Sequence, residues 1–505
     1  MAVTLGPLDL VVVDSLETAL HTHFGWSRFR AGQRPVVEAV LSGRDALAVL
    51  PTGGGKSLCY QLPALIRGGL VVVISPLVAL MEDQVLQLRR RGIAAACLHA
   101  GLDPVRRQQA MAALRDESLR LLYLAPERLQ GEATQRLLET HAAEGRLVAL
   151  AVDEAHCISA WGHDFRPDYR RLGLIRRLCP GVPMLALSAT AAPRVRADIL
   201  RLLDLRSPLV QVSSARRENL RYAMQRRPRD PMPQVLEALE QSRGATLIYA
   251  RTRRSVEHWA ERLQGQSVEA TPYHAGLEPA TRQTALTQFL EQERPVLVAT
   301  VAFGMGVDRG DVGLVLHLDL PSTPEGYLQE SGRAGRDGQP ARCLVLFSPG
   351  DRTSLGWAMQ AAAGRGTTPD ERHRLDLAQQ QLRRMEAVAE GEMCREQALL
   401  LAVGELVDPC GRCDRCSASP KRKDWSRQAT TLLTHLDDLD GTDMRRLGEH
   451  LALHETGQGE RWTWLARRLV QEELIRESND GVQRLQLRDS GRRYLERPWP
   501  LDFAA

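Results

Sequence analysis

The chain has 505 residues, of which 43% are hydrophobic and 25% are charged, a composition typical of a globular protein with about three or four domains. Its 66 basic and 62 acidic residues leave a net charge of only +4, so charge alone does not indicate nucleic-acid binding. No apolar run approaches the roughly 20 residues that span a bilayer, and residues 1–7 lack the basic start of a secretory signal. We therefore expect a cytoplasmic protein with no membrane segment.

Short apolar runs alternate with amphipathic stretches between residues 40 and 350, which is the pattern of α/β domains with parallel sheets. The polar stretch 216–233 holds three prolines and divides these runs into two series, so it predicts an interdomain boundary. The expected strands are 46–50, 70–74, 121–124, 147–152 and 184–187 in the first series, and 245–249, 296–299, 312–318 and 343–347 in the second.

The last third of the chain is predicted to be mostly helical, with a helix over 374–394 and a basic separator at 419–424. Helices at 429–436, 444–453 and 462–473 are then followed by two strand-like runs around Asn479-Asp480-Gly481, which predicts a winged helix. The winged helix has arginines, in and just before its third helix, that either approach DNA phosphates or form a solvated helix face: Arg461, Arg467 and Arg468. The expected domains are 1–214, 215–350, 351–423 and 424–505.

A glycine-rich segment, Leu50-Pro-Thr-Gly-Gly-Gly-Lys-Ser57, directly follows the first expected strand. Such a turn before a helix directs backbone N–H groups towards phosphate, so we predict a nucleotide site, although Leu50 stands where this motif usually has its first glycine. Lys56 would reach the β- and γ-phosphates and Ser57 would bind Mg²⁺. The expected phosphate-binding residues are Thr52, Gly53, Gly54, Gly55, Lys56 and Ser57.

The expected strand 147–152 ends at the acidic tetrapeptide Asp153-Glu154-Ala155-His156. A carboxylate at the end of a central strand near a phosphate loop is placed to bind Mg²⁺, and the next acid can activate a water molecule. We therefore expect Asp153 to bind magnesium and Glu154 to act on water, with His156 as a further catalytic residue.

These two motifs resemble those of the DExH-box helicases of superfamily II, and residues 157–167 narrow the resemblance to the RecQ family of DNA helicases. This segment, Cys-Ile-Ser-Ala-Trp-Gly-His-Asp-Phe-Arg-Pro, is similar to the aromatic-rich loop by which that family senses single-stranded DNA. Its rings offer faces for base stacking, and a buried aromatic cluster is the alternative interpretation. The expected DNA-binding residues are Trp161, His163, Phe165 and Arg166.

The resemblance implies further roles. Phe29-Arg30-Ala-Gly-Gln33 is similar to the adenine-reading element, with Gln33 making the contact and Arg30 supporting it. In the segment 329–338, the resemblance makes Arg336 an arginine finger and Arg333 its phosphate-side partner, although both could be surface charge. Other RecQ-like segments are Ser188-Ala189-Thr190, 273–277, 299–308 and Arg217-Glu218-Asn219-Leu220, where Ala215 replaces a preceding aromatic residue.

Nine cysteines fall into two groups. Five are scattered in apolar surroundings and are expected to be reduced core residues: Cys59, Cys97, Cys157, Cys179 and Cys343. Four lie within 23 residues, and four thiolates at such spacings suit a closed tetrahedral Zn²⁺ site, with an iron–sulfur cluster as the alternative. Similarity to the RecQ zinc-binding subdomain favours zinc. The expected ligands are Cys394, Cys410, Cys413 and Cys416.

The resulting hypothesis is an α/β protein with two RecA-like parallel-sheet domains, a helical zinc-binding subdomain and a winged-helix domain. The resemblance implies an ATP-dependent DNA helicase that moves 3′→5′ and unwinds duplexes in repair and recombination, with ATP, Mg²⁺ and Zn²⁺ as cofactors. Expected partners are single-stranded and duplex DNA, with single-strand-binding protein and other repair proteins as further candidates. The alternatives are an RNA helicase or a DNA-binding regulator with a relict ATPase core. Because the chain ends at Ala505, we expect no helical accessory domain.

Overall fold

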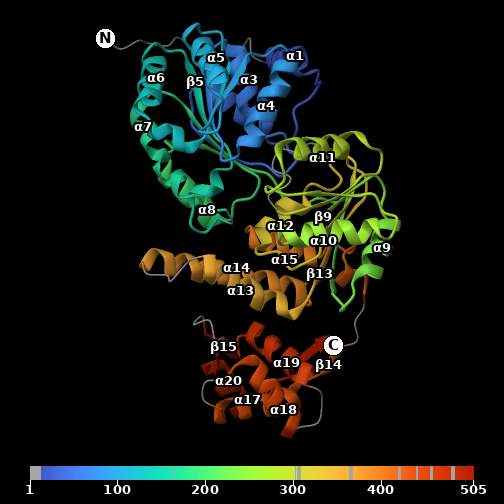
Figure 1. Cartoon of the computed structure of the whole chain (residues 1–505). Coiled ribbons are helices and arrows are strands. Elements are labelled where there is room, and N and C mark those ends of the chain that lie inside the picture. The colour runs from blue at the N-terminus through green and yellow to red at the C-terminus, as the bar shows by residue number, and fades with distance from the viewer. Residues whose placement is uncertain are drawn as a thin grey trace.

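The structure is a computed structural model that describes residues 13–162, 164–301, 303, 309–362, 368–418, 422–439, 442–454, 459–478 and 484–504. Two parallel sheets form the first two domains, drawn from blue to yellow in Figure 1. The helices that follow are orange, and the last domain is red. None of the described helices is both long and apolar enough to cross a membrane.

The first sheet has the strand order β3-β4-β2-β5-β6-β1-β7, and its strands all run parallel. A parallel sheet needs helices on both faces, because successive side chains point to opposite sides. Leu47 accordingly packs into one core, and its neighbour Ala48 packs into the other. The strands are β1 (Ala46–Val49), β2 (Leu70–Ile74), β3 (Ala95–Leu98), β4 (Leu121–Leu124), β5 (Leu147–Val152), β6 (Met184–Ser188) and β7 (Leu209–Val212).

Helices α1 to α4 supply the core on one face of this sheet, and α5 to α8 supply the core on the other. Their bounds are α1 (Val13–Phe24), α2 (Gln33–Leu41), α3 (Leu58–Arg67), α4 (Val78–Arg90), α5 (Pro104–Arg115), α6 (Glu132–Ala143), α7 (Gly173–Leu178) and α8 (Pro193–Leu202). Three 3₁₀ helices also belong to this domain: η1 (Pro126–Gln130), η2 (Ala155–Ile158) and η3 (Pro167–Leu172).

The second sheet has the order β10-β11-β9-β12-β13-β8 and is also parallel. Helices α9 and α10 cover one face, while α11, α12 and helices of the next subdomain cover the other. The elements are β8 (Leu220–Arg226), α9 (Met232–Glu240), β9 (Ala245–Tyr249), α10 (Arg253–Gln264), β10 (Ala270–Tyr273), α11 (Pro279–Glu291), β11 (Val296–Ala299), β12 (Val312–His317), α12 (Pro324–Ser331) and β13 (Ala341–Phe347).

The predicted strands are confirmed, and five of them have the expected bounds: β2, β4, β5, β9 and β11. Four strands of these two sheets were not predicted, namely β3, β7, β8 and β10, and each lies at a sheet edge. Polar or proline residues interrupt β7, β8 and β10, so these strands lack a continuous apolar run. By contrast, β3 is a short, fully buried apolar run that sequence analysis missed. The expected boundary 216–233 is wrong in part, because β8 lies inside it and pairs with β13 along its whole length.

A helical subdomain follows, with α13 (Pro349–Ala362), α14 (Pro369–Glu390), α15 (Arg395–Ala402) and α16 (Asp414–Ser417). Helix α14 begins with a capping box, in which the Thr368 side chain accepts from the backbone N–H of Glu371 while the Glu371 carboxylate accepts from the backbone N–H of Thr368. In Figure 1 this long helix runs beneath the first domain and beside α13. The predicted helix 374–394 is therefore present but starts and ends earlier.

The last domain contains the three expected helices, followed by an antiparallel hairpin of β15 and β16. The predicted hairpin tip at Asn479-Asp480-Gly481 lies outside the described residues. An antiparallel pair of β14 and β17 was not predicted. The elements are β14 (Arg422–Asp424), α17 (Ser426–Asp438), α18 (Met444–His454), α19 (Gly459–Gln471), β15 (Ile475–Glu477), β16 (Leu485–Leu487), α20 (Asp489–Glu496) and β17 (Asp502–Ala504).

Two arginines of α19 were expected to face either DNA or solvent, and both expectations are wrong. Arg467 pairs with Glu390 at 3.2 Å, and Arg468 pairs with Glu392 at 2.7 Å, so these side chains attach the last domain to the preceding helices. Both arginine side chains are at least nine-tenths buried. Arg461 is exposed and lies over the Trp425 ring at 4.6 Å.

One buried carboxylate joins several elements of the first domain. Asp45, just before β1, pairs with Arg176 of α7 and accepts hydrogen bonds from the backbone N–H groups of Met184 at 2.8 Å and Arg206 at 2.7 Å. Asp45 and Arg176 are 5% and 4% exposed, so neither charge has access to water if the other is removed.

We expect Asp45→Ala to lower the free energy of unfolding of the first domain by about 3–5 kcal/mol, because it leaves the Arg176 guanidinium buried without its carboxylate. Urea unfolding followed by circular dichroism measures the change. Glu132→Ala is the control. Because Glu132 forms an exposed pair with Arg136, this change should lower the free energy of unfolding by less than about 1 kcal/mol. Equal stability of the two variants would contradict the expectation.

Candidate functional site

A cleft of about 710 Å³ lies between the two parallel-sheet domains. It receives the loops that follow β1 and β5, consistent with ligands binding at the carboxyl ends of parallel strands. Most of the predicted nucleotide residues line it together. They are Arg30, Gln33, Thr52, Gly53, Gly55, Lys56, Ser57, Asp153 and Glu154 from the first domain, and Arg333 and Arg336 from the second.

The glycine-rich loop has a backbone that side chains would obstruct. Gly53 and Gly55 have φ of +79° and +73°, which favours glycine. A Cβ on Gly55 would lie 2.4 Å from Gln33 Nε2, and one on Gly54 would lie 2.8 Å from Pro51 O. The loop leads through Ser57 into the N-terminus of α3, where the positive end of the helix dipole attracts anions. This cradle fits the phosphates of a nucleotide.

Gln33 and Arg30 both contact this loop. The Gln33 amide donates to Gly54 O at 3.1 Å and to Gly55 O at 2.9 Å, while its oxygen accepts from the Arg30 backbone N–H at 2.7 Å. The Arg30 guanidinium donates to Gly53 O. The predicted adenine-reading residues therefore lie at the cleft and also hold the phosphate loop in shape.

Asp153 and Glu154 sit where β5 ends. The Tyr169 hydroxyl donates to the Asp153 carbonyl at 3.0 Å, and the Asp153 carboxylate accepts from the Glu154 backbone N–H at 3.0 Å. Glu154 adopts a left-handed φ of +48°, a conformation that costs energy in a non-glycine residue and is common at functional sites. Burial and the neighbouring Glu154 carboxylate raise the pKa of Asp153, while Lys56 lowers it. The oxygen donors of Ser57 and Asp153 are of the type that Mg²⁺ prefers.

His156 lies behind the cleft instead of lining it. Its Nδ1 is 3.3 Å from the Glu154 carboxylate and 3.0 Å from the Ser188 hydroxyl. That hydroxyl donates its proton to Thr190 O at 2.7 Å, so it accepts from the imidazole N–H. The imidazole thus connects the acidic motif to the Ser188–Thr190 segment that follows β6.

The second domain reaches the cleft through the turn that follows α12. Arg333 is buried, and its Nε donates to the Tyr249 hydroxyl at 3.0 Å. The Arg336 side chain lies against the phosphate loop, since a Cβ on Gly53 would be 3.4 Å from Arg336 Cγ. Similarly, a Cβ on Gly332 would be 3.2 Å from Thr52 Cβ. The two domains are therefore in contact at the site where the phosphates would bind.

The predicted DNA loop lies between η2 and η3, and its aromatic rings contact arginines. Arg194 lies over the Trp161 ring at 5.0 Å, and Arg170 lies over the Phe165 ring at 5.1 Å. Arg166 is tied to Asp164 at 3.0 Å and donates to Pro76 O at 2.8 Å. His163 lies outside the described residues.

Two residues of α14 also reach this loop. The His373 ring meets the Trp161 ring edge-on at 6.1 Å, and Arg374 lies over the Phe165 ring at 5.8 Å. Trp161 and Phe165 are half-buried, and Trp161 packs partly against the core of the first domain. The loop forms a polar and aromatic surface between the first domain and α14.

The four predicted zinc ligands come together. Their sulfur atoms all lie within 4.8 Å of one another, and this is the metal-binding group found among the described residues. The Cys410 backbone N–H donates to Cys394 Sγ at 3.2 Å, and the Cys413 N–H donates to Cys410 Sγ at 3.3 Å. Such hydrogen bonds stabilise thiolates, so the donor set fits Zn²⁺. The five other cysteines are buried, as expected.

Sequence analysis missed several residues near these sites. Trp26 lines the nucleotide cleft, is 44% exposed and stacks on Phe24 at 5.4 Å. An aromatic residue three positions before Phe29 was the available signal. Gln329 and Asp337 also line the cleft, which only the fold shows.

Three protein-family models match the chain. They are described as DEAD/DEAH box helicase over residues 30–199, Helicase conserved C-terminal domain over 230–338, and RecQ zinc-binding over 349–417. The third match includes all four clustered cysteines.

Relatives named ATP-dependent DNA helicase RecQ occur in several bacteria. The Pasteurella multocida protein is 38% identical over 89% of this chain and 67% of its own length. The Haemophilus influenzae protein is 40% identical over 81% of this chain and 64% of its own length. The Bacillus subtilis protein is 37% identical over 83% of this chain and 69% of its own length. The chain thus spans about two thirds of these relatives' lengths.

Solved structures share the fold at low sequence identity. The Mycobacterium smegmatis helicase Lhr, bound to ssDNA and AMP-PNP, covers 95% of this chain and 61% of its own, with a TM-score of 0.55 and 17% identity. The DEAD-box helicase Mss116, bound to ssRNA and UDP-BeF, covers 78% of this chain and 90% of its own, with a TM-score of 0.56 and 15% identity. Both likenesses confirm two RecA-like domains. The bacterial relatives and the zinc-binding match show that the chain belongs to the RecQ family of superfamily II helicases.

Proposed function

We propose that this chain is an ATP-dependent DNA helicase that moves 3′→5′ along one strand and unwinds duplexes in DNA repair and recombination. The observation that carries the proposal is the single cleft in which Lys56, Asp153 and Glu154 of one domain face Arg333 and Arg336 of the other. ATP, Mg²⁺ and Zn²⁺ are its cofactors. Membership of the RecQ family supports both the DNA substrate and the direction.

In the nucleotide cleft, each residue has a proposed role. The phosphate loop from Thr52 to Gly55 binds phosphate oxygens through its N–H groups, and Lys56 adds a positive charge at the β- and γ-phosphates. Ser57 and Asp153 would hold Mg²⁺, which when bound neutralises phosphate charge.

Glu154 orients the attacking water and accepts its proton. Arg336 stabilises the charge that develops on the γ-phosphoryl group, as arginine fingers do. Arg333, held by the Tyr249 hydroxyl, supports it from the phosphate side. Gln33 reads adenine with its amide, supported by Arg30, and exchanges its contacts with the loop carbonyls to do so.

Domain movement is coupled to hydrolysis through contacts behind the cleft. His156 joins Glu154 to Ser188, so a change in charge at the water-activating acid reaches the segment after β6. Closure of the two domains brings Arg336 onto the phosphates, and opening after hydrolysis withdraws it. Repeated cycles would move the enzyme along a strand.

The aromatic loop is proposed to bind single-stranded DNA through Trp161, His163, Phe165 and Arg166. The loop follows η2, and η2 follows Glu154 in the chain, so a movement of the loop would also move the acidic motif.

Proposed partners besides DNA are single-strand-binding protein and other repair proteins. The proposed location is the cytoplasm, because a reducing compartment keeps the clustered thiolates available for zinc. The last domain, residues 424–505, is proposed to be a winged helix that binds duplex DNA. The proposed bounds of the three domains before it are 1–214, 215–350 and 351–423.

We expect Lys56→Ala to abolish ATP turnover and unwinding, because the loop then lacks the ammonium that contacts the phosphates. Affinity for single-stranded DNA should change by less than about threefold, because the change lies outside the proposed DNA loop. Steady-state ATP hydrolysis with single-stranded DNA and with single-stranded RNA measures the loss and also tests the preference for DNA. Lys423→Ala, which removes an exposed lysine of β14, is the control and should hydrolyse ATP normally.

We expect Phe165→Ala and Arg166→Ala to reduce DNA-stimulated ATP hydrolysis about tenfold while leaving DNA-independent hydrolysis nearly unchanged, because a lost coupling contact does not dismantle the nucleotide site. Rates with and without a saturating oligonucleotide give the two values. Trp357→Ala removes an aromatic ring that is 64% exposed elsewhere, and it should change neither rate. Equal loss of both rates in Phe165→Ala would indicate a purely structural ring.

We expect Cys413→Ser to lower zinc content, solubility and DNA affinity together, because metal binding energy is also folding energy for this short segment. Elemental analysis of chelator-free protein gives the zinc content directly. Cys179→Ser, at a buried cysteine outside the cluster, should retain one zinc per chain. A zinc-free wild-type protein would contradict the assignment.

A further inference from the structure

The turn that carries the two cleft arginines is held from behind by the segment that links the two sheets. Arg217 Nη2 donates to Gly335 O at 2.5 Å, and Asn219 Nδ2 donates to the same oxygen at 2.8 Å. Gly335 has a φ of +54°, and a Cβ there would lie 2.4 Å from Asn219 Nδ2. The backbone between Arg333 and Arg336 is therefore fixed by donors from outside the turn.

Arg217 holds this turn with a geometry that other residues cannot reproduce. One Nη2 group spans two carbonyls, because it also lies 3.3 Å from Ala334 O, while Nε donates to Asn219 Oδ1 at 3.3 Å. A guanidinium presents its donors in a rigid planar fork, whereas the ammonium of lysine is a single mobile point. The fork thus fixes both the position and the orientation of the turn.

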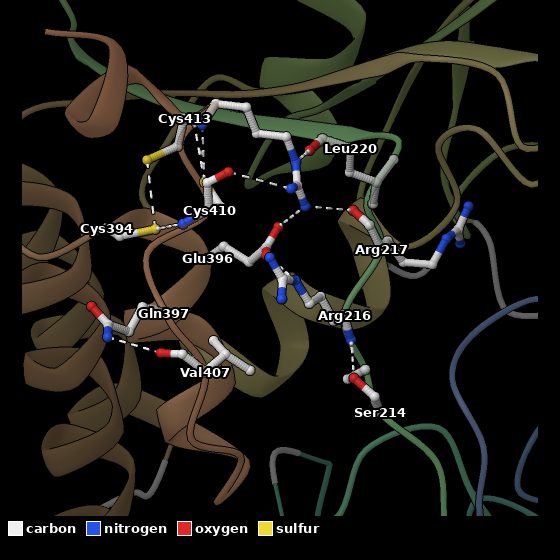
Figure 2. A network of polar contacts seen from close by, with 12 residues as sticks. Ser214, Arg216, Arg217, Leu220, Cys394, Glu396, Gln397, Val407, Cys410 and Cys413 are labelled. Atoms are coloured by element: carbon white, nitrogen blue, oxygen red, sulfur yellow. Dashed lines mark hydrogen bonds and ion pairs between the residues drawn. The ribbon is translucent and has the colours of Figure 1, made fainter.

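Arg217 is fixed in turn by Arg412, which lies between two zinc ligands in the sequence. Arg412 Nη2 donates to Arg217 O at 3.2 Å, and Arg412 Nε donates to Leu220 O at 3.1 Å. Figure 2 labels the residues around these contacts, with Arg217 and Leu220 on one side and Glu396 and the cysteines on the other. Arg412 also pairs with Glu396, whose side chain is 2% exposed. The same carboxylate binds Arg216 at 2.9 Å. The loop between the zinc-binding cysteines therefore holds the backbone of the interdomain segment through hydrogen bonds from Arg412.

We propose that Arg217 and Arg412 are positioning residues that connect the zinc site to the arginine finger. The cysteine cluster fixes the loop of Arg412, Arg412 fixes the backbone of Arg217, and the Arg217 side chain fixes the turn that presents Arg336 to the γ-phosphate. This inference rests on the proposed role of Arg336 in ATP hydrolysis. It gives the zinc subdomain an indirect part in the chemistry besides its part in folding.

The size of the expected effect follows from the value of a well-placed arginine. An arginine finger accelerates phosphoryl transfer about 10³- to 10⁵-fold, and a misplacement of about 1 Å can cost about 100-fold. Arg217→Ala should therefore lower kcat for ATP about 10- to 100-fold. KM for ATP should stay within about threefold, because the phosphate loop that binds ground-state ATP is untouched.

The test combines kinetics with binding of a transition-state analogue. Arg217→Ala should weaken binding of ADP with aluminium fluoride by the same factor as kcat, while binding of ADP alone is unchanged. Arg217→Lys should show an intermediate loss. Added to Arg336→Ala, the Arg217→Ala change should cause no further loss, because the residue it positions is already absent. Arg221→Ala removes an exposed arginine of β8, the strand that follows this segment, and should behave as wild type.

The outcomes separate this inference from the proposed function. Normal kcat in Arg336→Ala would overturn the arginine-finger assignment and the inference with it. An inactive Arg336→Ala together with normal kcat in Arg217→Ala would overturn the inference alone, as would an effect of Arg217→Ala on KM only. Arg412→Ala should keep one zinc per chain and lower kcat about 3- to 10-fold. Loss of zinc in that variant, with normal kcat in Arg217→Ala, would show that Arg412 serves the cluster only.

Discussion

Carboxylates that are buried where domains meet must be paired with cations, and this constraint decides how the parts of the chain sit against one another. Glu477 of β15 is fully buried and pairs with Arg352 of α13. Glu396 of α15 pairs with Arg216 and Arg412, which belong to different parts of the chain. A buried pair adds little net stability against an apolar alternative, but separating it leaves an uncompensated charge. The zinc subdomain therefore has one favoured position between its neighbours.

Helix α14 extends this arrangement across the middle of the molecule, between the first domain and the last domain (Figure 1). Near its start, His373 and Arg374 meet the aromatic loop of the first domain. At its end, Glu390 pairs with Arg467 of the last domain. Between these points, Arg384 reaches Glu325 on α12, the helix that leads into the cleft arginines. One rigid element thus touches the aromatic loop, the helix that precedes the turn of Arg333 and Arg336, and the last domain.

The central strands and the nucleotide motifs were predictable because their signals are local. Central parallel strands are continuous apolar runs, and phosphate loops and zinc clusters need fixed residue types at short spacings. Edge strands such as β8 lack a continuous apolar run, so β8 resembled a linker. The partners of Arg467 and Arg468 were not predictable either, since their carboxylates lie far away in the sequence. Amphipathic charge on a helix does not reveal whether it faces water or another domain.

The interdomain segment illustrates why polar composition is an ambiguous signal. Its arginines and prolines are typical of a solvated linker, yet Arg217 binds backbone carbonyls of the turn between Arg333 and Arg336, and Arg216 binds the buried Glu396. Every residue has a backbone carbonyl that can accept a hydrogen bond, so the residue type of the acceptor does not reveal that Arg217 will bind it. Where such contacts hold a catalytic turn, side chains remote from the substrate set its geometry. Polar stretches between domains in helicases of this fold are therefore places to look for residues that position the active site.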